Sequence, residues 1–295
     1  MEFIPAKTII SGYAENNSWF GHNYNMNIYK GCNHGCIYCD SRSDCYHVEN
    51  FDEVRAKKNT LALILRDLKS KRKTGVIGTG AMSDPYNPFE KDYLLTRSAL
   101  ELINAQGFGI SLATKSDLVL RDIDILKKIQ VHSPVIIKLT ITTCDDELCK
   151  KIEPNVVNSS KRFEAIKELT KAGLFAGILL MPVLPFLEDN LENISGIIQL
   201  AHESGAKFIY PAFGVTLRQN QRVWYYKKLD LLFPNLKQKY INQYGNDYEC
   251  RATNAKELWQ FFKKQCESYG LLYKMEDIIK GYKQGYGETQ LSLFD

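Results

Sequence analysis

Short apolar runs alternate with longer segments of helical periodicity along most of the chain. The apolar runs are four to eight residues long at their cores and rich in β-branched side chains, which predicts strands within 25–31, 74–80, 108–114, 134–143, 174–185 and 207–213. The segments between them carry apolar positions at helical spacing, which predicts helices over 90–107, 120–130, 159–173 and 188–204. The chain therefore reads as about six successive βα units.

Successive βα units imply a parallel sheet, and strands that are apolar on both faces suit a sheet covered on both sides. Right-handed crossovers curl six such units into a closed or partial barrel. We therefore predict an α/β fold, a partial (β/α)6 TIM-like barrel over residues 1–215. The later sequence is helical and aromatic-rich, which predicts a C-terminal helical extension over 216–280 and a flexible tail over 281–295.

Composition narrows the class of protein only slightly. The net charge of +4 is too small to argue for an acidic partner such as nucleic acid. No run approaches the roughly 18 apolar residues of a membrane span, and the N-terminus lacks the pattern of a signal peptide. We therefore expect a cytoplasmic protein with no membrane association. In such a compartment the eight cysteines are expected to be thiols or metal ligands rather than disulfides.

The densest chemistry lies in GCNHGCIYCDSR, residues 31–42, which places Cys32, Cys36 and Cys39 within eight positions. The segment follows the first predicted strand, at the barrel mouth where active sites are built. Closely spaced thiolates suit an iron–sulfur cluster or zinc. Three cysteines on a four-iron cubane leave one iron open to another ligand.

With the aromatic Tyr38 directly before the third cysteine, this motif resembles the signature of the radical S-adenosylmethionine (SAM) superfamily. The resemblance implies an enzyme with two cofactors, a [4Fe-4S] cluster and S-adenosyl-L-methionine. In that family the open iron binds the amino and carboxylate groups of SAM. Electron transfer then cleaves SAM to a 5′-deoxyadenosyl radical, which abstracts hydrogen from a substrate. A low-potential donor such as flavodoxin or ferredoxin is the implied electron source.

Two other interpretations of the cysteines need no SAM. A zinc knuckle takes a fourth ligand from the neighbouring side chains His34, Asp40, Cys45 or His47. That site requires neither a barrel nor a SAM pocket, so six βα units argue against it. A redox pair of Cys36 and Cys39 leaves Cys32 without a role.

The segment 78–97 resembles the spore photoproduct lyase-like (DNA repair photolyase-like) branch of the family, whose Ser-Asp pair after the second strand holds the amino group of SAM. Ser83 and Asp84 occupy those positions, and a hydroxyl and a carboxylate are suitable partners for an ammonium. An Asp-Pro turn at Asp84 is the structural alternative. The resemblance spans about residues 25–215.

The same branch implies further SAM contacts. Lys115, after the third strand, corresponds to the lysine that pairs with the SAM carboxylate, with Ser116 beside it. Thr140 or Thr142 corresponds to the small hydroxyl near the sugar. An exposed turn lysine is the alternative for Lys115, and strand alternation allows only one set of side chains on the fourth strand to point inward.

Two positions depart from the lyase of this branch. Ala81 stands where that lyase has a hydrogen-returning cysteine, and Asp40 stands where it has a tyrosine after the third cluster cysteine. The route by which hydrogen returns to the product is therefore missing, and we do not assign spore-photoproduct repair. Cys45 is the candidate hydrogen donor, with an ordinary loop thiol as the alternative.

The C-terminal QLSLF resembles the peptide with which bacterial replication and repair proteins bind the DNA sliding clamp. Leu293 and Phe294 supply apolar anchors and Gln290 supplies a polar head, with Leu291 as a further residue of the motif. The Gly-rich segment before it suits a tether. The alternative is a tail that packs its apolar residues on the barrel.

The segment 217–228 interleaves basic and aromatic residues, among them Arg218, Arg222, Trp224 and Tyr225, a mixture that suits phosphates and stacked bases. The alternative is an amphipathic helix with a basic outer face.

The leading hypothesis is a radical SAM enzyme that acts on DNA and is recruited by a sliding clamp. A modifier of RNA, protein or a small molecule is the second. A zinc-containing clamp-binding adaptor without catalysis is the third.

Overall fold

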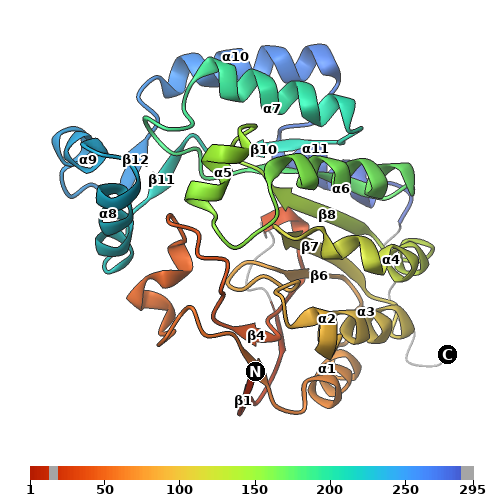
Figure 1. Cartoon of the computed structure of the whole chain (residues 1–295). Helices are drawn as coiled ribbons and strands as arrows, with labels where there is room; N and C mark the ends of the chain where they lie inside the picture. The colour runs from red at the N-terminus through yellow and green to blue at the C-terminus, as the bar shows by residue number, and fades with distance from the viewer. Residues whose placement is uncertain (13–18, 287–295) are drawn as a thin grey trace.

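The computed structural model describes residues 1–12 and 19–286. Its main sheet carries parallel strands that follow one another in chain order, as Figure 1 shows: β3 (Tyr24–Met26), β6 (Val76–Thr79), β7 (Gly109–Thr114), β8 (Val135–Thr140), β9 (Phe175–Leu180) and β10 (Ile209–Pro211). β2 (Ile10–Gly12) adds to the edge of the sheet, antiparallel to β3. The predicted α/β fold with a parallel sheet is therefore confirmed.

Helices cover the outer face of this sheet: α1 (Thr60–Lys69), α3 (Leu95–Ala105), α4 (Ile123–Gln130), α6 (Ser159–Lys171) and α7 (Leu191–Glu203). Outward side chains such as Ile110, Ile137 and Ile178 pack with these helices in the main core. The alternate residues Ile136 and Leu179 point to the inner face, because successive strand side chains alternate. The shorter helices α2 (Glu90–Tyr93) and α5 (Asp146–Ile152) follow strands β6 and β8 at the mouth.

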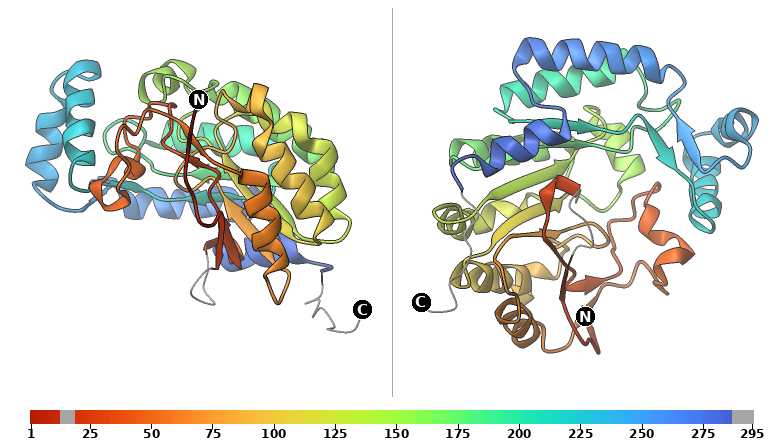
Figure 2. Two further views of the ribbon diagram at one scale, coloured as in Figure 1. Left: turned by 90° about the horizontal axis from the view of Figure 1, so that it is seen from below. Right: turned by 180° about the vertical axis from the view of Figure 1, so that it is seen from behind.

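The chain beyond β10 is mostly helical, and Figure 2 shows it from two further sides. The strands β11 (Gly214–Thr216) and β12 (Glu249–Arg251) pair antiparallel. The chain between them forms α8 (Gln221–Leu232) and α9 (Leu236–Tyr244). Next, α10 (Ala255–Tyr269) packs on α7, and α11 (Met275–Lys283) returns to the inner face of the sheet. Division of the chain at 215 and 280 stays a prediction. No helix among the described residues combines the length and apolarity needed to cross a bilayer.

Two predicted elements are interrupted. The strand expected over 25–31 ends at Met26, and β4 (Tyr29–Lys30) instead joins a separate small sheet with β5 (Arg55–Lys57) and β1 (Glu2–Ile4). The helix expected over 90–107 breaks at Leu94, whose φ is 50°. The buried carboxylate of Glu90 accepts the backbone N–H of Thr96 at 2.7 Å, which satisfies one of the free N–H groups at the new helix start.

Candidate functional site

The cysteine loop leaves β4 through a turn that requires glycine. Gly31 has a φ of +83°, and a Cβ there would lie 2.3 Å from the carbonyl oxygen of Glu53. Cys32 N donates to the carbonyl of Phe51 at 2.7 Å, and Ile37 N donates to the carbonyl of Ile152 at 2.9 Å. The loop is therefore held between the segment after it and the end of α5.

Cys32, Cys36 and Cys39 are free thiols, and ionisation of one raises the pKa of its neighbours. Burial raises the pKa of Cys32 to about 11 and raises the pKa of Cys36 well above its ordinary value. Iron must therefore displace protons from buried thiols, as metal binding to thiolates commonly does. No three His, Cys, Asp or Glu side chains in the described part of the chain lie close enough to hold one ion. A cubane instead takes each cysteine on a separate iron, so the donor set fits a [4Fe-4S] cluster.

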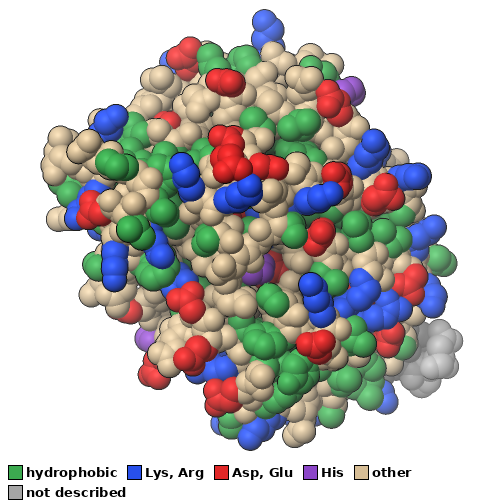
Figure 3. All heavy atoms as spheres, viewed as in Figure 1, with side chains coloured by type: hydrophobic (Ala, Val, Ile, Leu, Met, Phe, Trp, Pro, Cys, Tyr) green, Lys and Arg blue, Asp and Glu red, His purple; other side chains and the backbone are tan. Residues whose placement is uncertain are grey.

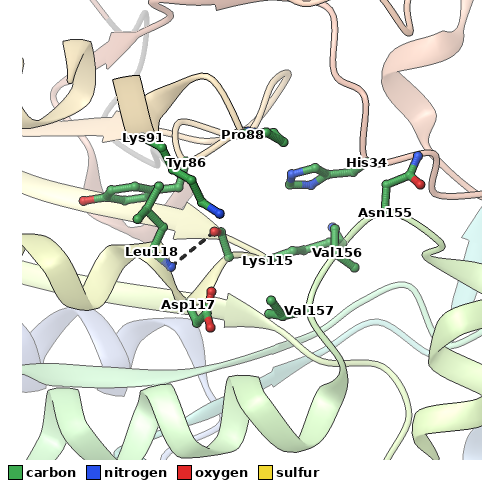
Figure 4. A pocket seen from close by; sticks show the side chains of 11 residues that line it. His34, Tyr86, Pro88, Lys91, Lys115, Asp117, Leu118, Asn155, Val156 and Val157 are labelled. Atoms are coloured by element: carbon green, nitrogen blue, oxygen red, sulfur yellow. Dashed lines mark hydrogen bonds between the residues drawn. The ribbon is translucent and has the colours of Figure 1, made fainter. Parts of the chain in front are cut away.

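A pocket of about 290 Å³ lies beside the cysteine loop. Figure 4 shows its lining, which combines polar and apolar side chains: His34, Tyr86, Pro88, Lys91, Lys115, Ser116, Asp117, Leu118, Asn155, Val156 and Val157. Cysteine-loop, β7-end and α5–α6 residues thus converge on one cavity. The face that carries it bears Lys and Arg side chains interspersed with acidic ones (Figure 3).

Lys115 supplies the cation of this pocket that lies nearest the cysteine motif. Its Nζ lies 5.7 Å from the ring centre of Tyr38. Burial lowers the pKa of Lys115, but Cys36 and Glu153 raise it more, and the net pKa lies above the ordinary value. Among the described residues, Nζ makes no hydrogen bond or ion pair with a carboxylate. A charged ammonium is therefore available to an anionic ligand.

Ser83 and Asp84 have partners within the protein. Ser83 Oγ donates to the carbonyl of Gly31 at 2.5 Å. The Asp84 carboxylate accepts the N–H of Tyr86 at 2.8 Å, the hydroxyl of Thr114 at 2.7 Å and the N–H of Lys115 at 2.8 Å. These bonds tie the cysteine loop to the end of β7. The predicted contact with an ammonium stays a prediction, and the observed role of the pair is to anchor the loop.

His34, inside the cysteine motif, also lies against this anchor. Its Nδ1 is 3.6 Å from Asp84 Oδ2, and both side chains are buried. Burial lowers the pKa of His34. From the sequence, His34 was predicted only as a possible zinc ligand. Nothing in the local sequence shows that Asp84, fifty residues later, packs against it.

The other predicted SAM contacts lie around the mouth of the sheet. Ser116 Oγ accepts the N–H of Leu118 at 3.2 Å and caps a short 3₁₀ helix. Thr140 is the last residue of β8 and Thr142 lies just beyond it, and both side chains are buried. Tyr38 is buried and donates its hydroxyl to Glu153. These side chains surround one mouth, while their contacts with SAM stay predictions.

Cys45 lies on the outer side of the cysteine loop. It is exposed, and its Sγ lies 3.7 Å from Arg218 Nη1. Arg218 Nε also donates to Asp40 at 2.9 Å, so Asp40 joins the loop to the segment before α8. The role of Cys45 as a hydrogen donor stays a prediction.

The predicted nucleic-acid segment divides into buried and accessible parts. Tyr225 is fully buried and donates to the hydroxyl of Tyr240 at 2.9 Å, so its predicted contact with a base is corrected: it faces the core of the C-terminal helices. Arg222 donates to the carbonyls of Leu217, Gly245 and Asp247. Trp224 is half-buried, with the guanidinium of Arg42 3.9 Å from its ring centre.

The residues of the predicted clamp-binding motif, Gln290, Leu291, Leu293 and Phe294, lie outside the described residues.

Comparison with known proteins identifies the family. The model of the Radical SAM superfamily matches residues 26–198. An uncharacterized protein of Methanocaldococcus jannaschii is 38% identical over 179 residues, which cover 60% of this chain and 66% of that protein. An uncharacterized protein of Mycobacterium tuberculosis (strain H37Rv) is 29% identical over 230 residues, 75% of this chain and 67% of that protein.

Among solved structures, spore photoproduct lyase shares the fold. A mutant with bound AdoMet and dinucleoside spore photoproduct gives a TM-score of 0.62 at 15% identity, with 86% of this chain and 77% of that chain covered. A tyrosine-to-phenylalanine mutant gives 0.65 at 15% identity, with 92% and 82% covered.

Proposed function

Because the chain belongs to the radical SAM superfamily, we propose that it is a radical SAM enzyme whose hydrogen-abstraction substrate is DNA. Members of the family use a [4Fe-4S] cluster and SAM; the cluster, reduced by an external donor, would pass one electron to SAM, which would give methionine and a 5′-deoxyadenosyl radical. The family identity makes the chain an enzyme and sets aside the clamp-binding adaptor without catalysis.

In this proposal Cys32, Cys36 and Cys39 hold the cluster. The observation that carries the assignment of the SAM site is Lys115, a charged ammonium in the pocket beside the cysteine loop without a carboxylate partner among the described residues. It is suited to the carboxylate of SAM, since a charge-assisted hydrogen bond in a partly buried site is strong. Ser83 bonds the start of the cysteine loop and Asp84 bonds the end of β7. Their predicted contact with the amino group of SAM stays a prediction. Ser116, Thr140 and Thr142 would line the rest of the SAM site.

DNA is the favoured substrate class because the fold is shared with spore photoproduct lyase, one structure of which holds a dinucleoside photoproduct. Arg218 and Trp224, on the accessible side of the cysteine loop, supply a cation and an aromatic ring of the kind that binds phosphates and bases. RNA, a protein or a small molecule is the alternative substrate. In each case a low-potential flavodoxin or ferredoxin would deliver the electron.

Recruitment to DNA is a separate part of the proposal. The terminal residues Gln290, Leu291, Leu293 and Phe294 would bind the groove of a DNA sliding clamp. Deletion of 290–295 should abolish binding to the clamp and leave SAM cleavage by the isolated enzyme unchanged. Undiminished clamp binding after the deletion would remove the recruitment proposal.

Isotope transfer tests the substrate. The anaerobically reconstituted enzyme would be given dithionite, SAM and either intact or ultraviolet-damaged DNA with deuterium at the sugar and base positions. We expect 5′-deoxyadenosine to form faster with DNA and to carry deuterium. Formation of unlabelled 5′-deoxyadenosine at the same rate with and without both DNAs would exclude DNA as the substrate and favour the alternative classes.

A further inference from the structure

A buried tyrosine–glutamate–arginine network packs against the cysteine loop. Tyr38, the residue before Cys39, donates its hydroxyl to one carboxylate oxygen of Glu153. The other oxygen of Glu153 lies 2.5 Å from Arg162 Nη2. The exposed fractions of the two charged side chains are 1% and 0%, so water solvates neither charge.

The guanidinium of Arg162 reaches two further segments of the mouth. Its Nε donates to the carbonyl of Val157 at 2.9 Å, in the wall of the pocket. Its Nη1 donates to the carbonyl of Thr140 at 2.8 Å, at the end of β8. One ion pair therefore connects the cysteine loop, the pocket wall and the strand end that carries the predicted sugar contact.

Stability alone is a weak reason for such a pair. Desolvation of two buried charges costs several kcal/mol per ion, and apolar residues of similar volume are often at least as stable. The charges of this pair also act on the site. Glu153 accepts the hydroxyl of Tyr38, the residue before Cys39, so the ion pair lies one side chain away from the cysteine motif.

We propose that Glu153 and Arg162 are positioning residues that hold Tyr38 and Cys39 in place and, as a balanced pair of opposite charges, set the reduction potential of the cluster. This inference rests on the proposed cluster site but not on the identity of the substrate. Net charge near an iron–sulfur cluster is one of the factors that set its potential. A negative charge stabilises the oxidised cluster and lowers the potential, and a positive charge raises it.

The chain contains a second network of the same composition, which serves as a matched control. Tyr29 donates its hydroxyl to Glu90, and Glu90 Oε2 lies 3.3 Å from Arg121 Nη2. Glu90 is as buried as Glu153, with none of its surface exposed. Tyr29 lies in β4, outside the cysteine motif, whereas Tyr38 lies inside the motif and directly precedes Cys39.

Redox titration of the reconstituted cluster, followed by electron paramagnetic resonance without SAM or DNA, tests the inference. The variants are E153Q, R162Q, the double variant E153Q/R162Q and the control E90Q, at an alkaline pH that keeps Glu153 ionised in R162Q. We expect E153Q to raise the midpoint potential, R162Q to lower it and the double variant to return it close to wild type. E90Q should leave the potential unchanged while it lowers the melting temperature of the apoprotein as much as E153Q does.

A purely structural role predicts a different pattern. Single variants that shift the potential in the same direction, or leave it unchanged while the apoprotein melts earlier, would overturn the inference. Should E153Q fail to take up iron, Y38F removes only the hydroxyl that joins the loop to Glu153. We expect Y38F to retain iron but to change the resonance spectrum and raise the KM for SAM at least tenfold, and an unchanged spectrum and KM would overturn the positioning role. A wild-type protein that binds no cluster would instead refute the proposed function.

Discussion

Lys115 directly after β7 and Lys138 within the neighbouring strand β8 are both buried lysines, yet their surroundings shift their pKa values in opposite directions. Lys115 follows β7 at the mouth, beside the cysteine thiols and Glu153, and its pKa lies above the ordinary value despite burial. Lys138 lies inside β8 on the inner face, 1% exposed, with Nζ 2.6 Å from Ser111 Oγ and 3.4 Å from His22 Nε2. Burial lowers the pKa of Lys138 to about 7.

The difference shows that neighbours, and not burial alone, decide whether a lysine carries charge. Lys115 lies near Glu153 and near cysteine thiols that would be thiolates on a bound cluster, and these negative charges favour its protonated ammonium form. No carboxylate among the described residues lies within ion-pair distance of Lys138, whose amine is instead held by a hydroxyl, an imidazole and the ring of Phe20. The mouth is therefore suited to bind an anion, while the inner cluster fills the interior of the sheet at a cost in stability.

The largest effect is expected from the replacement of Lys138 by an apolar residue of similar length. K138M should raise the free energy of unfolding at pH 7 by roughly 3 kcal/mol, because the unfavourable burial of an amine disappears while two hydrogen bonds are lost. Urea unfolding of the wild type and the variant measures the difference. A variant less stable than the wild type would mean that the cluster is a net stabilising element.

The pH dependence of that difference sharpens the comparison. The ordinary lysine pKa is 10.5 and the folded value is about 7, so between these values the unfolded chain binds a proton that the folded protein does not. The contribution of Lys138 to stability therefore rises with pH in this window. The advantage of K138M should shrink by roughly 2 kcal/mol between pH 7 and pH 9. An advantage that stays constant over this range would show that Lys138 titrates normally.

Replacement of Lys115 should affect the cofactor more than the fold. K115M should raise the KM for SAM roughly 10- to 100-fold, since a hydrogen bond to a charged group contributes about 1.5–3 kcal/mol. K138M should leave this KM unchanged and serves as the control. Equal KM values for K115M and the wild type would remove Lys115 from the SAM site.

The smallest effect is expected at Ser111, which bonds both Lys138 and His22 at 2.6 Å. S111A should destabilise the protein by about 1–2 kcal/mol, because two buried polar groups lose a shared partner. Thermal unfolding at neutral pH measures it. In the K138M background the same substitution should cost less, and an equal cost in both backgrounds would show that Ser111 and Lys138 are not coupled.

Local pattern was sufficient for most of the parallel sheet. The β-branched runs at β7, β8 and β9 lie close to their predicted positions because central strands must be apolar on both faces. The split after Met26 was missed because it depends on the pairing of β4 with β5, and the break at Leu94 was missed because the Glu90 side chain bonds the backbone of Thr96 instead of continuing a regular helix. No helical or strand periodicity encodes such contacts.

The site shows the same division. The cysteine motif was recognised from its spacing, and Lys115 was carried over from the resemblance to the lyase-like branch. Arg162 was read as part of an ordinary helix, and only the fold shows that it turns inward to Glu153. Lys138 was likewise passed over within a strand, although a lysine in a run buried on both faces is itself a signal of a polar partner. Tyr225 was assigned to the surface because its basic neighbours outweighed its place on the inner side of α8.

The central claim is that the three thiols of the cysteine loop hold a cluster that cleaves SAM. Its most direct test is the yield of 5′-deoxyadenosine from SAM and dithionite after anaerobic reconstitution of the wild type and of C32A/C36A/C39A. We predict iron–sulfur absorption and steady 5′-deoxyadenosine formation by the wild type, with neither in the triple variant. Equal yields from the two proteins, or none from an iron-loaded wild type, would contradict the claim.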